Sequence, residues 1–199
     1  MTEADIRRIR LVTRHFYDLQ GLTLVVLGSV EIVWGLVWLE THNLTVIVLL
    51  VAGSVLAFIW PKKYLDRYYA GRFGRVQGGG GFPLPWVIVL SLATPLLLQD
   101  RWQPAGTSVF ILVLGSHPAW LLFDGWPDRR HYLVAVGATV LAGVMAFHAG
   151  SPSDAIARAF VLFGISEIPC GLADHALLVR TMRGLRAWSS DAQASERGE

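Results

Sequence analysis

Long apolar runs separated by short polar segments dominate the chain. A helix needs about 20 mostly apolar residues to cross a bilayer core of about 30 Å, or about 17 when the fit is short. Six runs approach or reach this length: Leu22 to Leu39, Leu44 to Trp60, Leu84 to Leu98, Ser108 to Phe123, Tyr132 to Phe147 and Ile156 to Leu178. The pattern predicts an all-α protein, a polytopic membrane helix bundle of about six transmembrane helices.

The third and fourth runs are short, and each contains a proline, Pro95 and Pro118. Proline inside a membrane helix is tolerated when neighbouring helices satisfy the backbone groups that it leaves unpaired. These two prolines therefore predict kinks rather than helix ends.

Composition agrees with lipid as the surroundings of most of the chain. Hydrophobic residues make up 53% of the sequence and charged residues only 16%, whereas charged residues form about a quarter of an ordinary soluble domain. The one cysteine, Cys170, has no second cysteine to pair with, so an intrachain disulfide and a cysteine metal motif are both excluded.

Positive charge is distributed unevenly about the six runs, which predicts the orientation of the protein. Of the 17 Lys and Arg residues, only Arg101 and Arg158 fall on one side, and the other fifteen fall on the opposite side. Basic residues favour the cytoplasmic side of membrane proteins, so both termini are expected in the cytoplasm. This clustering indicates orientation, and nucleic acid is not an expected partner.

The two terminal segments and one internal loop are expected outside the bilayer core. Residues 1–19 predict an interfacial amphipathic helix, because Ile6, Ile9, Val12 and Phe16 share one face. Residues 20–180 form the six-span transmembrane domain, and residues 181–199 form a polar cytoplasmic tail, expected to be disordered after Trp188.

A basic interfacial loop, residues 61–83, is expected within the transmembrane domain, and it contains four consecutive glycines near its end. Basic and aromatic side chains alternate in it, which is typical of a segment that lies on anionic lipid. Its expected lipid-facing or partner-facing residues are Lys62, Lys63, Arg67, Tyr68, Tyr69 and Arg72.

Two short matches favour an internal repeat. The residues from Val26 to Ser29 recur from Val113 to Ser116, and those from Ser54 to Ala57 resemble those from Thr139 to Ala142. The offsets of 87 and 85 residues are nearly equal, as a three-plus-three inverted repeat would produce. Chance matches are frequent, however, in segments composed mainly of valine, leucine, glycine and alanine.

A longer match joins the first and sixth spans. The pattern Gly-x-x-Glu-Ile-x-x-Gly-Leu begins at Gly28 and begins again at Gly164. A simple three-plus-three duplication does not predict this pairing. Glycines seven residues apart lie on one helix face, so their first interpretation is close helix packing rather than a ligand site.

Ionisable side chains near the middle of three spans are the strongest candidates for chemistry. They are Glu31, His117 and Glu167. A charged group at the centre of a span costs about 2.5 to 3.5 kcal/mol by insertion scales, and such groups often mark an ion or substrate path. Asp174 and His175 follow Glu167 by two helical turns and extend this polar path toward the cytoplasm.

Each candidate also has a purely structural interpretation. Either glutamate can be a protonated acid that hydrogen-bonds a neighbouring helix. His117 can bond a carbonyl freed by the kink at Pro118, and Asp174 and His175 can reach for lipid head groups at the interface.

The leading hypothesis is a small transporter or channel-like carrier with a midplane carboxylate and histidine site. A non-catalytic membrane scaffold or accessory subunit is the first alternative, because no catalytic motif is present. A metal-binding or haem-binding membrane enzyme is the second, but no motif supports a metal or haem, so no cofactor is expected.

Compact loops and an arginine-rich composition favour the bacterial cytoplasmic (inner) membrane as the location. The expected partners are the lipid bilayer with its anionic head groups and either a second copy of the chain or another membrane protein. Nothing in the sequence identifies a substrate.

Overall fold

A computed structural model describes residues 3–14, 16, 19, 21–41, 44–73, 107–108, 111–112 and 116–197. No strand occurs among these residues, which confirms the all-α prediction for this part of the chain. The helices are α1 (Glu3–Arg14), α2 (Gly21–Thr41), α3 (Leu44–Phe73), α6 (Ser116–Asp124), the 3₁₀ helix η1 (Arg130–Tyr132), α7 (Leu133–Phe147) and α8 (Pro152–Arg197).

Within the described residues, three helices are long and apolar enough to cross a membrane. They are Gly21–Thr41, Arg130–Phe147 and Ser153–Leu185, and they contain the predicted first, fifth and sixth spans. The protein is therefore a helical membrane protein, and the total of six spans stays a prediction.

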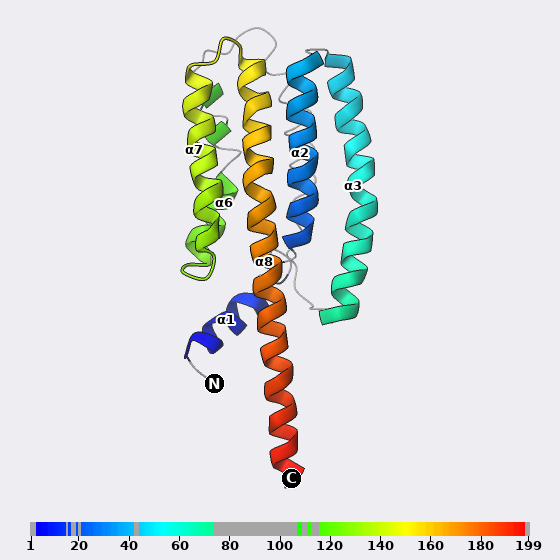
Figure 1. Ribbon diagram of the computed structural model, residues 1–199, viewed down its shortest axis with the longest axis vertical. Coiled ribbons are helices and arrows are strands. Elements are labelled where there is room, and N and C mark those ends of the chain that lie inside the picture. Colours follow the sequence, from blue (N-terminus) through cyan, green and yellow to red (C-terminus); the bar gives the residue numbers. More distant parts are fainter. Residues whose placement is uncertain are drawn as a thin grey trace.

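The long helices stand side by side (Figure 1). α8 lies between α7 and α2, and α3 packs on the other side of α2. α2 and α8 run in opposite directions, because Gly21 at the start of α2 meets Gly171 and Gly35 near its end meets Ala157. Both chain ends lie at the same end of the molecule, called the lower end here, where α1 crosses beneath the bundle (Figure 1).

The predicted second span and the first part of the predicted basic loop form one helix, α3, which continues to Phe73. Pro61 lies inside this helix without ending it. The third predicted span and the four glycines lie outside the described residues. Of the fourth span, the structure describes two short helical pieces and then α6, which contacts α7 and η1.

α8 is far longer than a membrane crossing requires. Its 46 residues correspond to about 69 Å at 1.5 Å per residue. The prediction of disorder after Trp188 is wrong, because the helix continues to Arg197. Ala192, Gln193 and Ala194 are strong helix formers, and their intrinsic propensity extends a helix that already exists.

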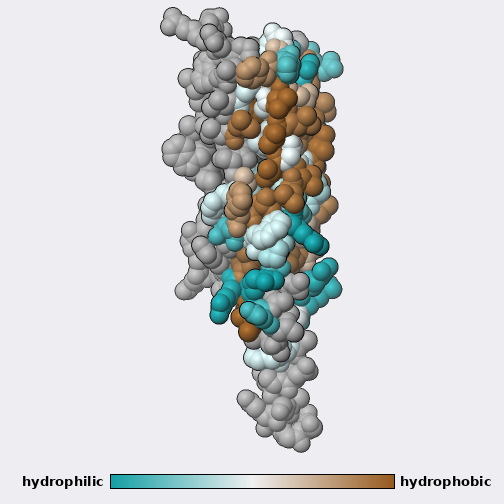
Figure 2. All heavy atoms as spheres, turned by 90° about the vertical axis from the view of Figure 1, so that its left-hand side faces the viewer, coloured by the Kyte–Doolittle hydropathy of each residue, from teal (hydrophilic) through white to brown (hydrophobic). Residues whose placement is uncertain are grey.

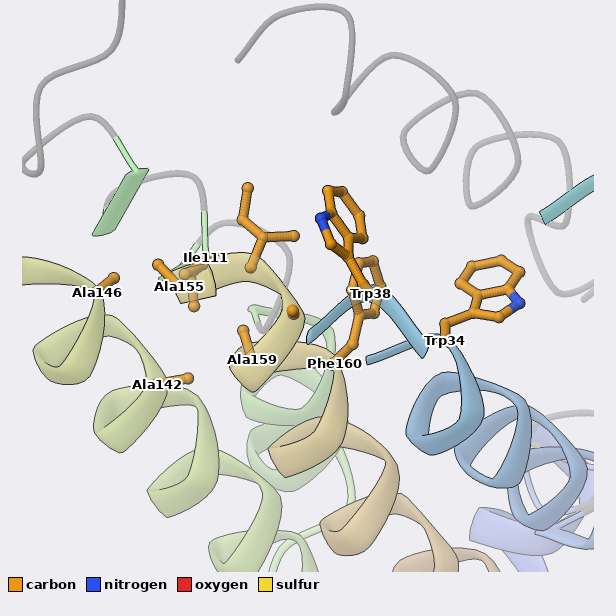
Figure 3. Packing of buried hydrophobic residues seen from close by; sticks show 10 residues of the cluster. Trp34, Trp38, Ile111, Ala142, Ala146, Ala155, Ala159 and Phe160 are labelled. Atoms are coloured by element: carbon orange, nitrogen blue, oxygen red, sulfur yellow. The ribbon is translucent and has the colours of Figure 1, made fainter. Parts of the chain in front are cut away.

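Two apolar clusters hold the two ends of the bundle together. At the upper end, Trp34 and Trp38 of α2 pack with Phe160 of α8, in a cluster that extends across α8 to small residues of α7 (Figure 3). The Trp38 indole Nε1 donates a hydrogen bond of 2.6 Å to Ser153 Oγ. At the lower end, residues of α1 pack with α3 and α8; the buried members of this lower apolar cluster are Val12, Phe16, Leu19, Leu65, Tyr69 and Leu178.

The outer surface has the distribution that lipid requires. Figure 2 shows hydrophobic residues in a continuous band along the helices, with hydrophilic residues gathered below it and at the top. Large apolar side chains of α7 are exposed in this region; they are Leu133, Val134, Val140, Leu141, Val144 and Phe147. In a membrane these side chains would contact acyl chains rather than water.

Candidate functional site

Small residues bring α2 and α8 into backbone contact. Gly21 lies against Gly171, and Gly28 lies against Gly164. A Cβ atom added at Gly28 would lie 2.8 Å from the Gly164 carbonyl oxygen, closer than real Cβ contacts. The structural interpretation of the glycine pattern is thus confirmed, because these positions exclude any side chain.

This contact places the two midplane glutamates together. The carboxyl groups of Glu31 and Glu167 hydrogen-bond one another across the α2–α8 interface. The Oε2 atoms of both residues are buried and have no hydrogen-bond partner among the described residues. Apart from its partner glutamate, neither Oε2 atom has a described polar group to bond with.

The pair lies in the middle of the apolar region. Glu31 is ten residues from either end of α2, which is about 15 Å along the helix. Two ionised carboxylates in contact repel each other strongly where the surroundings are apolar. The pair is therefore stable only while it holds at least one proton.

The longer sequence match now has a geometric meaning. Residues n of α2 and n + 136 of α8 correspond in the two copies of the pattern. If each residue is exchanged for its counterpart, the contact between Gly28 and Gly164 maps onto itself. The contact between Gly35 and Ala157 maps onto the contact between Gly171 and Gly21. The two segments thus pack about a local pseudo-two-fold axis, with the glutamate pair beside it.

The three-plus-three repeat is not tested by this contact, because residues 113–115 of its best match lie outside the described residues. His117 belongs to α6, on the α7 side of the bundle. Its side chain is also outside the described residues, so its proximity to the glutamate pair stays a prediction.

A second polar cluster lies at the lower end of the bundle around Asp174, which is fully buried. Asp174 Oδ1 is 2.9 Å from His131 Nε2, and Oδ2 accepts a 2.7 Å hydrogen bond from the Tyr132 hydroxyl. One turn before Asp174, the Cys170 thiol donates to the His131 carbonyl oxygen at 3.5 Å. α8 is thereby tied to η1 through both oxygens of one carboxyl group.

His175, the neighbour of Asp174, points to a different helix. Its Nδ1 is 2.9 Å from the Tyr69 hydroxyl of α3. The same hydroxyl accepts a 3.3 Å hydrogen bond from the Leu22 backbone N–H. Because a tyrosine hydroxyl is both donor and acceptor, one side chain joins the start of α2, the lower part of α3 and α8.

The assignment of Tyr69 to a lipid-facing or partner-facing surface is wrong, since its side chain is fully buried. Leu65 and Tyr69 are four residues apart on α3 and share one face, which packs against Phe16 and Leu178. Lys63 and Arg67 lie on the opposite, exposed side of the helix. The alternation of basic and aromatic residues therefore reflects an amphipathic helix with a buried aromatic face.

Sequence reasoning missed His131, Tyr132 and Arg129 as members of the lower cluster. Arg129 is fully buried, and its three guanidinium nitrogens have no hydrogen-bond partner among the described residues. The only available signal was their position, directly before an apolar span, and this position is equally typical of residues exposed at a membrane interface.

Comparison of the chain with protein-family models, with curated proteins and with solved structures gives no match. The chemistry of the site must therefore be judged from its own groups. Within the described residues, no three His, Cys, Asp or Glu side chains come together in a metal-binding arrangement. The groups occur instead as hydrogen-bonded pairs of carboxyl, imidazole and phenol, which can bind, hold and release protons.

Proposed function

We propose that the protein is a small transporter or channel-like carrier coupled to protons, with the Glu31–Glu167 pair as its proton-binding site. The observation that carries the proposal is the hydrogen-bonded contact of two carboxyl groups halfway along apolar helices. A carboxyl group at this depth is costly when charged, and such residues commonly serve ion or proton movement.

Coupling follows from where the pair lies. Loss of its shared proton would place two negative charges across a helix contact that has no side chains to separate them. Repulsion would then favour separation of α2 from α8, and reprotonation would favour closure. Proton occupancy thereby selects between two arrangements of the central helices, which is the requirement for proton-coupled transport.

The test is proton flux in vesicles that contain the purified protein and a pH-sensitive dye. We expect Glu31→Gln and Glu167→Gln each to reduce flux by about tenfold or more, because an amide keeps the shape but cannot exchange a proton. Glu40→Gln is the matched control, since Glu40 is an exposed glutamate of the same helix.

Flux of protons by the parent protein that survives both Glu31→Gln and Glu167→Gln would overturn the proposal. So would the absence of proton flux in the parent protein under a pH gradient and under a membrane potential. A fall in flux with Glu40→Gln equal to that with Glu31→Gln would also count against a specific role of the pair.

We also propose that the lower end of the bundle faces the cytoplasm of a bacterial inner membrane, with anionic head groups as partners. Exposed basic side chains near this end support the orientation; they include Arg10, Lys63, Arg67, Arg72, Arg130, Arg180 and Arg183. Positive charge is retained on the cytoplasmic side during membrane insertion and attracts anionic lipid there.

Single cysteines at two glycines test this orientation. Gly71 at the lower end and Gly150 in the upper loop are both exposed, and an added Cβ meets nothing within 4 Å at either position. A membrane-impermeant thiol reagent added to intact cells should label Gly150→Cys and spare Gly71→Cys, while the native Cys170 is buried. The reverse labelling would overturn the orientation.

A scaffold or accessory subunit is the second candidate, and the length of α8 favours it. The apolar stretch of α8 ends at Leu185, yet the helix continues to Arg197, a further length of about 18 Å. Deletion of residues 186–199 separates the two candidates. A carrier keeps its proton flux without this extension, whereas a scaffold without flux loses its association with a partner protein.

A further inference from the structure

One hydrogen bond connects the buried interior of the lower cluster to its surface. The Asp174 side chain is completely buried, whereas 21% of the His131 side chain is exposed. Their Oδ1 and Nε2 atoms are 2.9 Å apart. His131 is thus the group through which a proton can pass between water and Asp174.

The surroundings of this pair come from three elements. η1 supplies His131 and Tyr132, α8 supplies Cys170, Asp174 and His175, and α3 supplies Tyr69. Arg129 precedes η1 and is fully buried, and its carbonyl oxygen accepts a hydrogen bond from the Tyr132 backbone N–H. Of the two carboxylate oxygens, Oδ2 accepts the Tyr132 hydroxyl and Oδ1 faces His131 alone among the bonds that the structure describes.

Asp174 also lies on the path toward the glutamate pair. It follows Glu167 by seven residues on α8, which is two turns, or about 10 Å along the same helix face. Cys170 lies between them on that face. The face of α8 therefore carries the midplane carboxyl at one level and the Asp174–His131 pair nearer the lower end.

We propose that His131 is the proton-exchange residue of the lower end, and that Asp174 passes protons between His131 and the Glu31–Glu167 pair. This inference rests on the proposed function. Nδ1 of the imidazole takes a proton from water, and Nε2 gives its proton to Asp174 Oδ1. The ring is again neutral, and Asp174 is a neutral carboxyl. A chain of water molecules then carries the proton over about 10 Å to Glu167, which leaves Asp174 ionised again. One proton enters and one leaves, with no change in electrons.

A structural tie between η1 and α8 would need only a hydrogen-bond donor at position 131. Glutamine retains a donor to Asp174, but its amide neither binds nor releases a proton near neutral pH. The relay and the tie therefore make opposite forecasts for His131→Gln. A structural tie predicts that proton flux in this variant equals that of the parent protein, and a relay predicts that most of the flux is lost.

The first experiment measures proton flux in reconstituted vesicles. His131→Gln should reduce flux by about tenfold or more, and imidazole added to the buffer should restore flux to His131→Ala. His148→Gln is the control, because His148 is an exposed histidine at the opposite end of α7 and should leave flux unchanged. Parent-like flux in His131→Gln would overturn the relay.

The second experiment does not depend on transport. After a rapid pH drop, infrared absorption of the carboxyl C=O group reports protonation of the glutamate pair, identified as the band that Glu31→Gln removes. The relay predicts that this band appears about tenfold more slowly in His131→Gln and reaches the same final amplitude. An unchanged rate would overturn the relay and leave the proposed function standing.

The outcomes of the two proposals are therefore separable. If Glu31→Gln removes no band that responds to pH, the pair does not exchange protons, and the proposed function fails together with the relay. If the band is present and appears in His131→Gln at the same rate as in the parent protein, only the relay fails. A reduced amplitude in His131→Gln would overturn the relay, because a relay changes the rate of protonation and leaves its extent unchanged.

Discussion

α8 meets two of its neighbours, α2 and η1, in different ways. Against α2 it packs backbone to backbone, with Gly164 and Gly171 at the contact. Against η1 it uses side chains, because Asp174 bonds both His131 and Tyr132. The first contact is limited by volume and the second by the satisfaction of polar groups, so the two should respond to substitution by different rules.

The difference also separates two roles of buried acids. The glutamates face each other where no other polar partner is described, whereas Asp174 has a donor for each oxygen. A carboxyl with complete partners is held in one place. A carboxyl pair that shares one hydrogen bond has no other described partner to hold it in place when its protonation changes.

The largest effect is expected from one added methyl group at the volume-limited contact. Gly164→Ala places a Cβ against the Gly28 carbonyl oxygen and the Ile32 side chain. Overpacking of this kind costs about 1 to 3 kcal/mol, and a backbone atom cannot move aside as a side chain can. The free energy of unfolding, measured by detergent titration in mixed micelles, should fall by at least the upper part of that range.

Gly137→Ala is the matched control for this substitution. Gly137 is an exposed glycine of α7, and an added Cβ there meets nothing within 4 Å. Alanine is the better helix former, so this variant should be as stable as the parent or slightly more stable. Equal losses for the two glycines would mean that backbone freedom, rather than packing against α2, determines the effect.

The contact between α8 and η1 should be weakened by the loss of a hydrogen-bond acceptor rather than by added side-chain volume. Asp174→Asn leaves either His131 Nε2 or the Tyr132 hydroxyl without its acceptor, at a cost of about 1 to 3 kcal/mol. Detergent titration measures the loss. Asp66→Asn is the control, because Asp66 is an exposed residue that pairs with Lys62 one turn away, and its change should stay within about 0.5 kcal/mol.

The same comparison shows how far sequence could predict the site. Glycines spaced by seven residues predicted a packed helix face, because that spacing returns to one side of a helix. The partner of that face was not predictable, since Gly28 and Gly164 are far apart in the chain. Apolar patterns mark which side of a helix is buried without naming the neighbour.

The lower cluster was less predictable for a related reason. Asp174 and His175 were recognisable as polar residues within an apolar run. Their partners, His131 and Tyr69, lie 43 and 106 residues away. Each partner sits in a segment where exposure at the membrane surface explains the sequence equally well, so only the fold distinguishes a buried Tyr69 from an exposed Lys63.

A smaller effect on stability is expected at the glutamate pair. Glu31→Gln keeps the shape and a hydrogen bond to Glu167, and hydrogen bonds between membrane helices average about 0.6 kcal/mol. The free energy of unfolding should therefore change less in Glu31→Gln than in Asp174→Asn. A loss as large as that of Gly164→Ala would show that the pair mainly holds α2 and α8 together.

The smallest effect should come from a third kind of contact, an ion pair at the edge. Arg7 Nε of α1 is 3.3 Å from Asp128 Oδ2, and 54% of the Arg7 side chain is exposed. Water and salt screen such a pair, so Arg7→Ala should cost about 0.2 to 1 kcal/mol and less at high ionic strength. Val12 of α1 and the neighbouring Phe16 are buried in the lower apolar cluster, which packs α1 against α3 and α8. A salt-independent loss above this range would mean that Arg7 contributes packing, and that charge is not what attaches α1 to the bundle.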